Sequence, residues 1–196
     1  MKQLVLASGN AGKLREFNQL LAPLGIEVLP QSAFNVPEAE EPHGTFVENA
    51  LEKARHAARH TGLPALADDS GLSVDALGGA PGVLSARYAG EPKSDARNNA
   101  LLLEKLRDET NRRAFFICVL ALVRHPADPT PLIAEGRLYG EILPEARGEG
   151  GFGYDPLFFI PGENATAAEL SMEAKNRISH RGQASAELLR RLQAQG

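Results

Sequence analysis

Five short segments carry residues whose types and spacing could do chemistry. The first is Ser8-Gly9-Asn10-Ala11-Gly12-Lys13, which follows an apolar run and precedes a helical pattern. Such a loop brings backbone N–H groups and the positive end of a helix to an anion, and Lys13 adds a point charge. The P-loop spacing G-x-x-x-x-G-K is absent. The segment therefore predicts either an anion site or a helix cap with small residues for packing.

The second segment is acidic. Its carboxylates are Glu40, Glu41, Asp68, Asp69 and Asp75. Adjacent aspartates in an apolar strand are costly unless they are compensated, and they point to opposite faces of the strand. A divalent cation would supply the compensation, because Mg²⁺ takes one or two carboxylates together with phosphate oxygens and water. The alternative is an Asp-rich turn beside a solvated acidic loop.

The third and fourth segments are a helix face and a glycine-rich loop. Asn49 and Lys53 are four residues apart, so they share one face of a helix. That face lies either toward a cleft or at the surface beside acidic neighbours.

The glycine-rich loop is the fourth segment. Two aromatic rings and a carboxylate lie among four glycines in Gly148-Glu149-Gly150-Gly151-Phe152-Gly153-Tyr154-Asp155-Pro156. Flat rings on such a loop suit stacking on a base, with Asp155 binding the base or anchoring the loop. The alternative is a hairpin turn with aromatic plugs.

The fifth segment is cationic and lies just before the last predicted helix. It contains Lys175 and Ser179-His180-Arg181-Gly182. Carbonyl or phosphate oxygens would suit these donors, and the alternative is a helix cap at Ser179 with solvated charges. The single cysteine, Cys118, lies in an apolar run and is expected to be a buried, inert thiol.

The elements that must position these segments follow an α/β order. Apolar residues 2–7 predict a strand, and the spacing of Leu14, Phe17, Leu20, Leu21 and Leu24 predicts a helix before a second strand at 26–29. Thr45 to Glu48 form a capping box for a helix that ends near Gly62. Residues 65–75 predict two short strands around a turn at Ser70-Gly71. A helix at 95–106, paired strands at 113–124 and 132–143 and a helix at 183–192 complete a predicted mixed sheet flanked by helices.

Composition limits the class of protein. The chain has 196 residues, 43% of them hydrophobic and 23% charged, which is ordinary for a globular domain. Its net charge of −4 argues against binding of long nucleic acid, although a small polyanion needs only a few local cations. The longest apolar run, residues 114–123, is about half a membrane span. Without a long apolar signal core or a second cysteine, a cytoplasmic protein is expected.

Together and in order, these segments resemble the inosine triphosphate pyrophosphatase family, the non-standard purine nucleoside triphosphate pyrophosphatases of the bacterial dITP/XTP type. The resemblance covers residues 3–192. It rests on the glycine loop at Ser8, Thr45-Phe46-Val47-Glu48-Asn49-Ala50, Ala67-Asp68-Asp69-Ser70-Gly71-Leu72, Leu77 to Gly82 with Ser85-Ala86-Arg87-Tyr88, Phe152-Gly153-Tyr154-Asp155-Pro156 and Ser179-His180-Arg181-Gly182. It implies one elongated α/β domain over residues 1–196, with two lobes around a central cleft.

The resemblance also implies hydrolysis of ITP, dITP and XTP to the monophosphate and pyrophosphate, with Mg²⁺, by a homodimer that spares ATP and GTP. Carried over, the implied catalytic residue is Asp69, acting as general base, and the implied metal ligands are Glu41 and Asp69, with Asp68 beside them. The implied substrate contacts are Ser8, Gly9, Asn10, Ala11, Gly12, Lys13, Lys53, Ser70, Phe152, Gly153, Tyr154, Asp155, Lys175, His180 and Arg181.

Two departures from the family pattern bear on this assignment. Pro42-His43-Gly44 replaces the usual Thr-Gly after the acidic pair, which affects the placement of Glu41, and Leu84 stands where many members carry an aromatic residue. Three other functions are alternatives. The first is a Maf-type pyrophosphatase for modified pyrimidine nucleotides, and the Ser8-Gly9-Asn10 opening and the His180-Arg181 pair argue against it. The second is a nucleotide sensor that does not hydrolyse, and the third is a structural or interaction protein.

Overall fold

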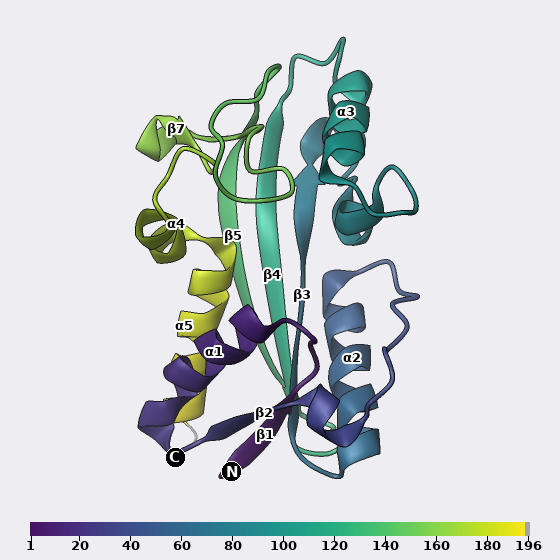
Figure 1. Cartoon of the computed structure of the whole chain (residues 1–196), viewed down its shortest axis with the longest axis vertical. Coiled ribbons are helices and arrows are strands. Elements are labelled where there is room, and N and C mark those ends of the chain that lie inside the picture. Colours follow the sequence, from purple (N-terminus) through teal and green to yellow (C-terminus); the bar gives the residue numbers. More distant parts are fainter. Residues whose placement is uncertain (195–196) are drawn as a thin grey trace. The chain divides into compact units, whose positions relative to one another are not determined.

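The computed structural model describes residues 1–194, and it contains a β-sheet flanked by α-helices (Figure 1). The strands are β1 (Gln3–Leu6), β2 (Glu27–Pro30), β3 (Ala65–Val74), β4 (Arg113–Val123), β5 (Leu132–Ile142), β6 (Phe158–Ile160) and β7 (Ala165–Thr166). The α-helices are α1 (Ala11–Leu21), α2 (Phe46–Thr61), α3 (Asp95–Lys105), α4 (Met172–Ile178) and α5 (His180–Gln193). Short 3-10 helices are η1 (Ala22–Leu24), η2 (Gln31–Phe34), η3 (Asp75–Leu77), η4 (Gly82–Arg87) and η5 (Pro161–Glu163).

The sheet is mixed. Its seven strands follow the order β2-β1-β3-β4-β5-β6-β7. Strand β1 runs parallel to β2 and to β3, with α1 and α2 as the intervening helices. Strand β6 is antiparallel to both β5 and β7. The mixed sheet flanked by helices that the sequence predicts is therefore confirmed.

The chain divides into two compact units. The first unit contains Met1–Asp69, Cys118–Gly136 and the chain from Ala184. The second unit contains Ser70–Ile117 and Arg137–Gln183. The division falls inside β3, between Asp69 and Ser70, so the candidate site residues form two sets, one in each unit.

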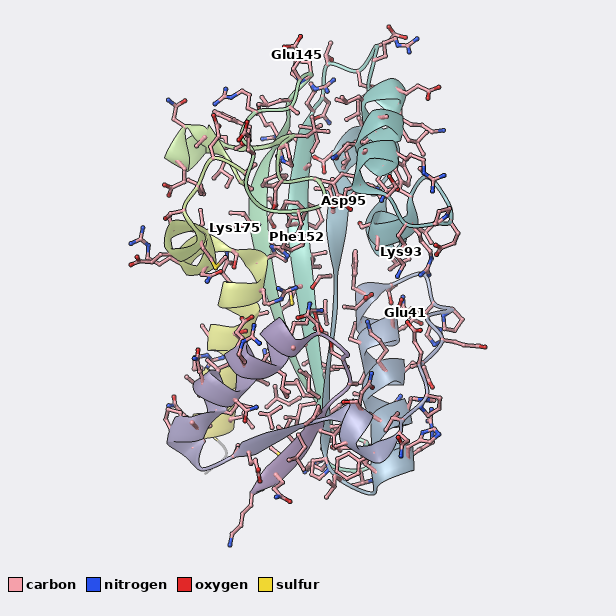
Figure 2. All side chains as sticks on the ribbon, in the orientation of Figure 1. Glu41, Lys93, Asp95, Glu145, Phe152 and Lys175 are labelled. Carbon is pink, nitrogen blue, oxygen red and sulfur yellow. The ribbon has the colours of Figure 1, made fainter. Side chains whose placement is uncertain are left out.

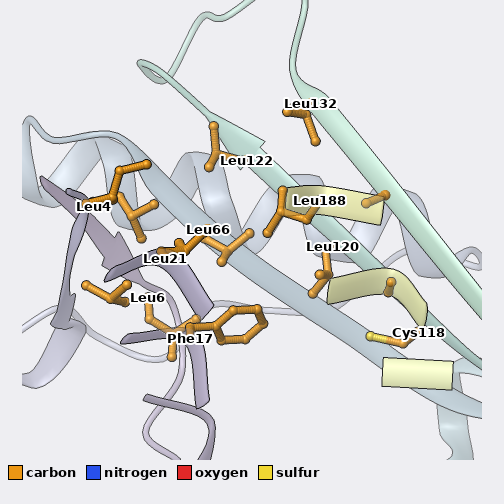
Figure 3. Packing of buried hydrophobic residues seen from close by; sticks show 14 residues of the cluster. Leu4, Leu6, Phe17, Leu21, Leu66, Cys118, Leu120, Leu122, Leu132 and Leu188 are labelled. Carbon is orange, nitrogen blue, oxygen red and sulfur yellow. The ribbon is translucent and has the colours of Figure 1, made fainter. Parts of the chain in front are cut away.

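The core of the first unit lies between the sheet and two helices. Phe17 and Leu21 of α1 and Leu188 of α5 pack against apolar side chains from one face of the strands (Figure 3). The strand residues of this cluster are Leu4, Leu6, Val28, Leu66, Cys118, Leu120, Leu122, Leu132 and Ala134. Alternate strand residues point to the opposite face, which α2 covers with Ala50, Ala54, Ala57 and Ala58 (Figure 1). As expected, Cys118 is a fully buried thiol.

A separate core fills the second unit. Leu102 and Leu106, in and just after α3, pack with Leu72 and Val74 of β3 and with Phe158 of β6. The cluster also contains Ala114, Phe116, Leu138, Ile142, Tyr154, Leu157, Ile160 and Ala167. This core includes Tyr154, a residue that the resemblance assigns to substrate contact.

Two predicted boundaries were wrong. Residues 65–74 form one continuous strand rather than two strands around a turn at Ser70-Gly71. A tight turn there would favour a positive φ at Gly71, but Gly71 is not among the positive-φ glycines. Helix α5 begins at His180 rather than near Gln183, because the Ser179 side chain accepts from the backbone N–H of Gly182 (3.0 Å) and caps the helix start.

The predicted helix starts at Asn10 and Thr45 are confirmed. The Asn10 side chain accepts from the backbone N–H groups of Gly12 and Lys13, and Thr45 Oγ1 accepts from the N–H of Glu48 (3.3 Å). Helix α2 ends at Gly62, which adopts the left-handed conformation with φ of 69°. Within residues 1–194, no helix has the length and apolar character needed to cross a membrane.

Candidate active site

The loop between β1 and α1 is held by its own asparagine. Asn10 Oδ1 accepts from the N–H groups of Gly12 (2.8 Å) and Lys13 (3.1 Å), and the Asn10 N–H donates to Ser8 Oγ (3.1 Å). A Cβ added at Gly9 would meet no atom within 4 Å, so the space beside this residue is open. The helix-cap interpretation of this loop is confirmed. Anion binding beside Gly9 stays a prediction.

Asp68 and Lys13 form a partly buried ion pair. The ammonium of Lys13 lies 3.0 Å from Oδ1 and 2.7 Å from Oδ2 of Asp68, whose side chain is 3% exposed. Both atoms of the carboxylate are therefore bound by one cation. The pair joins the start of α1 to β3, 55 residues away in the sequence.

Asp69 faces a different lysine. The ammonium of Lys53 on α2 lies 3.1 Å from Asp69 Oδ1 and 2.6 Å from Glu41 Oε1. The side chains of Lys53, Asp69 and Glu41 are 16%, 12% and 29% exposed. One lysine thus bridges two carboxylates from separate segments.

Two lysines therefore compensate the adjacent aspartates. The sequence predicts either a divalent cation as the compensation or an Asp-rich turn. The structure pairs Asp68 with Lys13 and Asp69 with Lys53, and binding of a cation beside them stays a prediction. The predicted opposite orientation of the two side chains is consistent with their separate partners. Of the other acidic residues singled out, Glu40 is exposed and Asp75 begins η3 in the second unit.

The Asp69 carboxylate retains an unused oxygen. Its Oδ2 is buried and has no hydrogen-bond partner among residues 1–194. Burial raises the pKa of Asp69 above its ordinary value, and the positive charge of Lys53 only partly opposes that rise. For Lys53, burial opposes the charged form, but Asp69 and Glu41 outweigh it and raise the lysine pKa. A buried carboxylate with an open oxygen and a raised pKa is suited to accept a proton or bind a cation.

Asn49 lies on the helix face that carries Lys53, and its amide is bound to a neighbouring loop. Its side chain is 1% exposed, and it bonds both backbone groups of His43. Ser70, the next residue after Asp69, has a buried Oγ with no partner within the described chain.

In the second unit, the glycine-rich loop presents one ring and buries the other. Phe152 is 70% exposed, whereas Tyr154 is 4% exposed and its hydroxyl donates to the carbonyl of Ser85 (2.7 Å). Burial raises the pKa of Tyr154, which keeps the phenol protonated as a donor. The aromatic-plug interpretation therefore describes Tyr154, and Phe152 has the exposure that stacking requires.

Asp155 anchors the loop. It is 3% exposed, and its Oδ2 accepts from the N–H of Phe152 (2.9 Å) and from the ammonium of Lys175 on α4. The same ammonium lies 4.8 Å from the centroid of the Phe152 ring, so Lys175 ties the carboxylate and the ring together (Figure 2). Of the two roles predicted for Asp155, the structure shows the anchoring one.

The last two candidates begin α5. The ring of His180 stacks on Phe116, with centroids 5.1 Å apart and an interplanar angle of 18°. Arg181 follows it in the first helical turn, and both residues are half-buried. A helix start capped by Ser179 holds them, which is the alternative given for the fifth segment, and ligand binding by these donors stays a prediction.

Two surface hollows lie outside both residue sets. The hollow in the second unit has a volume of about 500 Å³ and is lined by Asp75, Arg113, Ala114, Phe115, Tyr139, Gly140, Glu141 and Pro161. The hollow in the first unit has a volume of about 670 Å³ and is lined by Met1, Leu24, Ile26, Leu122, Arg124, Asp128, Thr130, Leu132, Leu192 and Gln193. The hollow in the second unit includes Asp75, one of the carboxylates of the second segment, and neither hollow is lined by a residue that the resemblance assigns to substrate, metal or catalysis.

Comparison with known proteins decides the family. A model of the Ham1 family matches residues 4–191. The chain belongs to the Ham1 family. The family resemblance predicted from the sequence is thereby confirmed.

Similar proteins cover the Ham1 chain from end to end. It is 68% identical over 192 residues to a dITP/XTP pyrophosphatase of Chromobacterium violaceum, and the match covers 98% of each chain. A HAM1 protein from Coxiella burnetii has 53% identity and a TM-score of 0.96, covering 99% of this chain and 100% of that one. The Staphylococcus aureus Ham1 protein has 42% identity and a TM-score of 0.94, with full coverage of both chains.

The first unit of this Ham1 chain has donors that fit a divalent cation of the Mg²⁺ type. The open, buried Oδ2 of Asp69 and the nearby carboxylate of Glu41 are the hard oxygen ligands that such an ion prefers. Within residues 1–194, no cluster of three or more His, Cys, Asp or Glu side chains has metal-binding geometry. Two carboxylates are nevertheless enough for Mg²⁺, because phosphate oxygens and water usually complete its shell.

Sequence reasoning missed the residues that hold the loops of this Ham1 chain. In the second unit, the N–H of Gly153 donates to Asp95 Oδ2 (2.7 Å), and its carbonyl accepts from Asn99 Nδ2 (2.9 Å). In the first unit, the sequence predicts Asn49 to face a cleft or the surface, but its side chain binds the backbone of His43. The sequence carries only a weak signal for these contacts, because it shows no more than polar side chains near helix starts, next to loops that carry candidate residues.

Proposed function

We propose that this chain hydrolyses non-standard purine nucleoside triphosphates, namely ITP, dITP and XTP, to the nucleoside monophosphate and pyrophosphate. The observation that carries the proposal is Asp69, a buried carboxylate with an open Oδ2, a raised pKa and Lys53 at its other oxygen. The 68% identity to a dITP/XTP pyrophosphatase supports this substrate class. Hydrolysis would proceed by attack of water on the α-phosphorus, and the bond from that phosphorus to the β-phosphate oxygen would break.

In this mechanism, Asp69 is the general base. Its Oδ2 carries two lone pairs, so one would accept the proton of the attacking water while the other faces the cation. Burial, which raises the pKa of this carboxylate, favours the uptake of that proton. Lys53 stays charged beside it and holds the carboxylate in place through Oδ1. The proton would then pass to solvent as pyrophosphate leaves.

The cations and N–H groups of the first unit would neutralise the phosphates. Lys13 and Lys53 each carry three N–H donors, and the loop at Gly9 has open space for an anion. Glu41 and Asp69 would hold Mg²⁺, which supplies further charge neutralisation on the triphosphate when it is bound. Such preorganised charges stabilise the negative charge that develops as the bond breaks.

Residues of the second unit would recognise the base. The exposed ring of Phe152 is suited to stack on a purine, with Lys175 fixed beside it. His180 and Arg181 are donors for the 6-oxo group of hypoxanthine and xanthine, where adenine carries an amino group. We assign Tyr154 and Asp155 to the framework of this loop because both are buried. The Tyr154 hydroxyl donates to the carbonyl of Ser85, and Asp155 accepts from the N–H of Phe152.

The identity of the metal, the assembly and the location belong to the same proposal. Mg²⁺ and a homodimer rest on the family resemblance, and a cytoplasmic location rests on the sequence features given above. Only the choice of Mg²⁺ also draws on the carboxylate donors of the first unit.

The test is pyrophosphate release from ITP, XTP, dITP, ATP, GTP and dTTP, with Mg²⁺ and with a chelator. Release from ITP, dITP and XTP that stops with chelator is the expected result. Equal release from all six would retain the chemistry and contradict the base assignment of His180 and Arg181. Binding of ITP without any release would contradict the assignment of Asp69 as base and favour a sensor.

A further inference from the structure

Asn49 binds a loop backbone with both ends of its amide. Its Oδ1 accepts from the N–H of His43 (3.0 Å), and its Nδ2 donates to the carbonyl of the same residue (3.1 Å). The side chain is 1% exposed, so both bonds are shielded from water. Because the contact uses only the backbone of residue 43, it does not depend on the histidine side chain.

We call this pair of bonds the Asn49–His43 clamp. Two further contacts join α2 to the same loop. The three helix residues are spaced four and three apart, which places them on one face. The later a residue lies in the helix, the earlier in the loop is the residue that it contacts. The contacts are Asn49 with His43, Lys53 with Glu41 (2.6 Å) and His56 with the carbonyl of Pro37 (2.9 Å).

We propose that Asn49 is a positioning residue that sets the place of Glu41 for cation binding. The Lys53–Glu41 ion pair is partly exposed, and such pairs contribute little to fixing a segment by themselves. The buried clamp at His43 fixes the chain two residues after Glu41. It also explains how the loop is held although Pro42-His43-Gly44 departs from the family pattern, since the clamp binds only the backbone of residue 43.

Asparagine is suited to this role because it offers one donor and one acceptor in one plane. Alanine would remove both bonds. Aspartate would keep an acceptor for the His43 N–H, but it has no donor for the His43 carbonyl. Its added negative charge would by itself tighten cation binding, so the two effects of this variant have opposite signs.

The inference rests on the proposed function, in which Glu41 helps to hold a divalent cation. The test measures Mn²⁺ binding to the full chain from the loss of the free-ion electron paramagnetic resonance signal. The variants are Asn49→Ala, Glu41→Gln, the double variant and His43→Ala, with thermal unfolding recorded for each. The Mg²⁺ concentration for half-maximal pyrophosphate release from dITP is measured alongside.

Asn49→Ala is expected to weaken Mn²⁺ binding by about tenfold or more, as loss of a residue supporting a metal ligand typically does. The double variant should bind Mn²⁺ no more weakly than Glu41→Gln, because Asn49 acts through Glu41. His43→Ala should behave like the wild type, since its backbone is unchanged. These three results together support the proposal.

Wild-type Mn²⁺ affinity in a folded Asn49→Ala variant would overturn it, as would fully additive losses in the double variant. Unchanged affinity in Glu41→Gln would overturn the metal role of Glu41, and so would separate a failure of the proposed function from a failure of the clamp. If Asn49→Ala does not fold, Asn49→Ser replaces it, because serine adds no charge and is too short to make both bonds to His43. Weaker Mn²⁺ binding in that variant supports the clamp, and equal or tighter binding overturns it.

Discussion

The two units present their candidate residues in opposite ways. In the first unit the residues are charged and neutralise one another, as in the Lys13–Asp68 pair and the bridge from Lys53 to Asp69. In the second unit the prominent group is an exposed ring, Phe152, on a loop whose polar groups are bonded within the unit. Charge chemistry and base recognition are thus assigned to different sets of residues, so variants in the two sets should change different kinetic quantities.

The units share one device for holding a loop. A helix next to the loop bonds the N–H and the carbonyl of a single loop residue. In the first unit Asn49 of α2 does this to His43, and in the second unit Asp95 and Asn99 of α3 do it to Gly153. Each clamped residue lies close in sequence to a residue that we assign to substrate or metal.

The largest expected effect is that of Asp69→Asn. The amide cannot accept the proton of the attacking water, so turnover of dITP should fall by about 10²- to 10⁴-fold. Binding of dITP, measured by isothermal titration calorimetry, should change far less. Turnover close to that of the wild type would remove Asp69 from the role of base.

Phe152→Ala should affect base recognition by the second unit. Loss of a ring that stacks on a base costs about 1–3 kcal/mol, so the KM for dITP should rise by roughly five- to 150-fold. The Mn²⁺ affinity should be unchanged, because the metal ligands lie in the first unit. An unchanged KM would mean that Phe152 does not contact the base.

A smaller effect is expected for Asn99→Ala. This change removes the donor to the Gly153 carbonyl but leaves Phe152 itself in place. Loss of one neutral hydrogen bond is worth about 1 kcal/mol, so the KM for dITP should rise about fivefold. A matched control is Asn111→Ala, an exposed asparagine of the same unit whose side chain accepts from the N–H of Arg113, its neighbour in the sequence by two residues. A KM change as large in the control would show that Asn99 does not act through the loop.

The smallest effect on activity is expected at Asp128, a buried first-unit carboxylate outside both site sets. Side-chain hydrogen bonds from Arg124 outweigh the cost of burial and hold the pKa of Asp128 well below its usual range. Asp128→Asn should lower the free energy of unfolding by about 1–2 kcal/mol, after allowance for solvent screening at the exposed Arg124. The kcat/KM for dITP should not change.

The lowered pKa of Asp128 makes its contribution to the free energy of unfolding depend on pH. A carboxylate whose folded pKa is depressed stabilises the protein above its unfolded pKa of about 4. That stability is lost as the pH falls from this value toward the folded pKa. The difference in unfolding free energy between wild type and Asp128→Asn should therefore shrink below pH of about 4. A difference that stays constant from pH 7 to pH 3 would contradict the role given to this carboxylate.

Local patterns predicted the elements well. Periodicity and caps located α1, α2 and the strands at 113–123 and 132–142 to within a residue or two. The continuous β3 was missed because Ser70-Gly71 carries turn residues, whereas sheet pairing and burial determine the backbone there. Long-range packing overrode the local preference.

The candidate site was predictable only in part. Residue types drew attention to Asp68 and Asp69, but their lysine partners lie 55 and 16 residues away and follow from the fold. The clamps were hidden for a different reason. Their targets are backbone groups, which every residue type carries, so His43 and Gly153 leave no trace of the contact in the sequence.

The central claim is that charged residues of the first unit drive hydrolysis whatever the base, and that residues of the second unit choose the base. The most direct measurement is kcat/KM for dITP and dATP, by pyrophosphate release, in Lys53→Met and Arg181→Ala side by side. Lys53→Met should lower both values by the same factor and leave their ratio unchanged, whereas Arg181→Ala should lower the ratio by about tenfold or more. A changed ratio in Lys53→Met, or an unchanged ratio in Arg181→Ala, would contradict this division of labour.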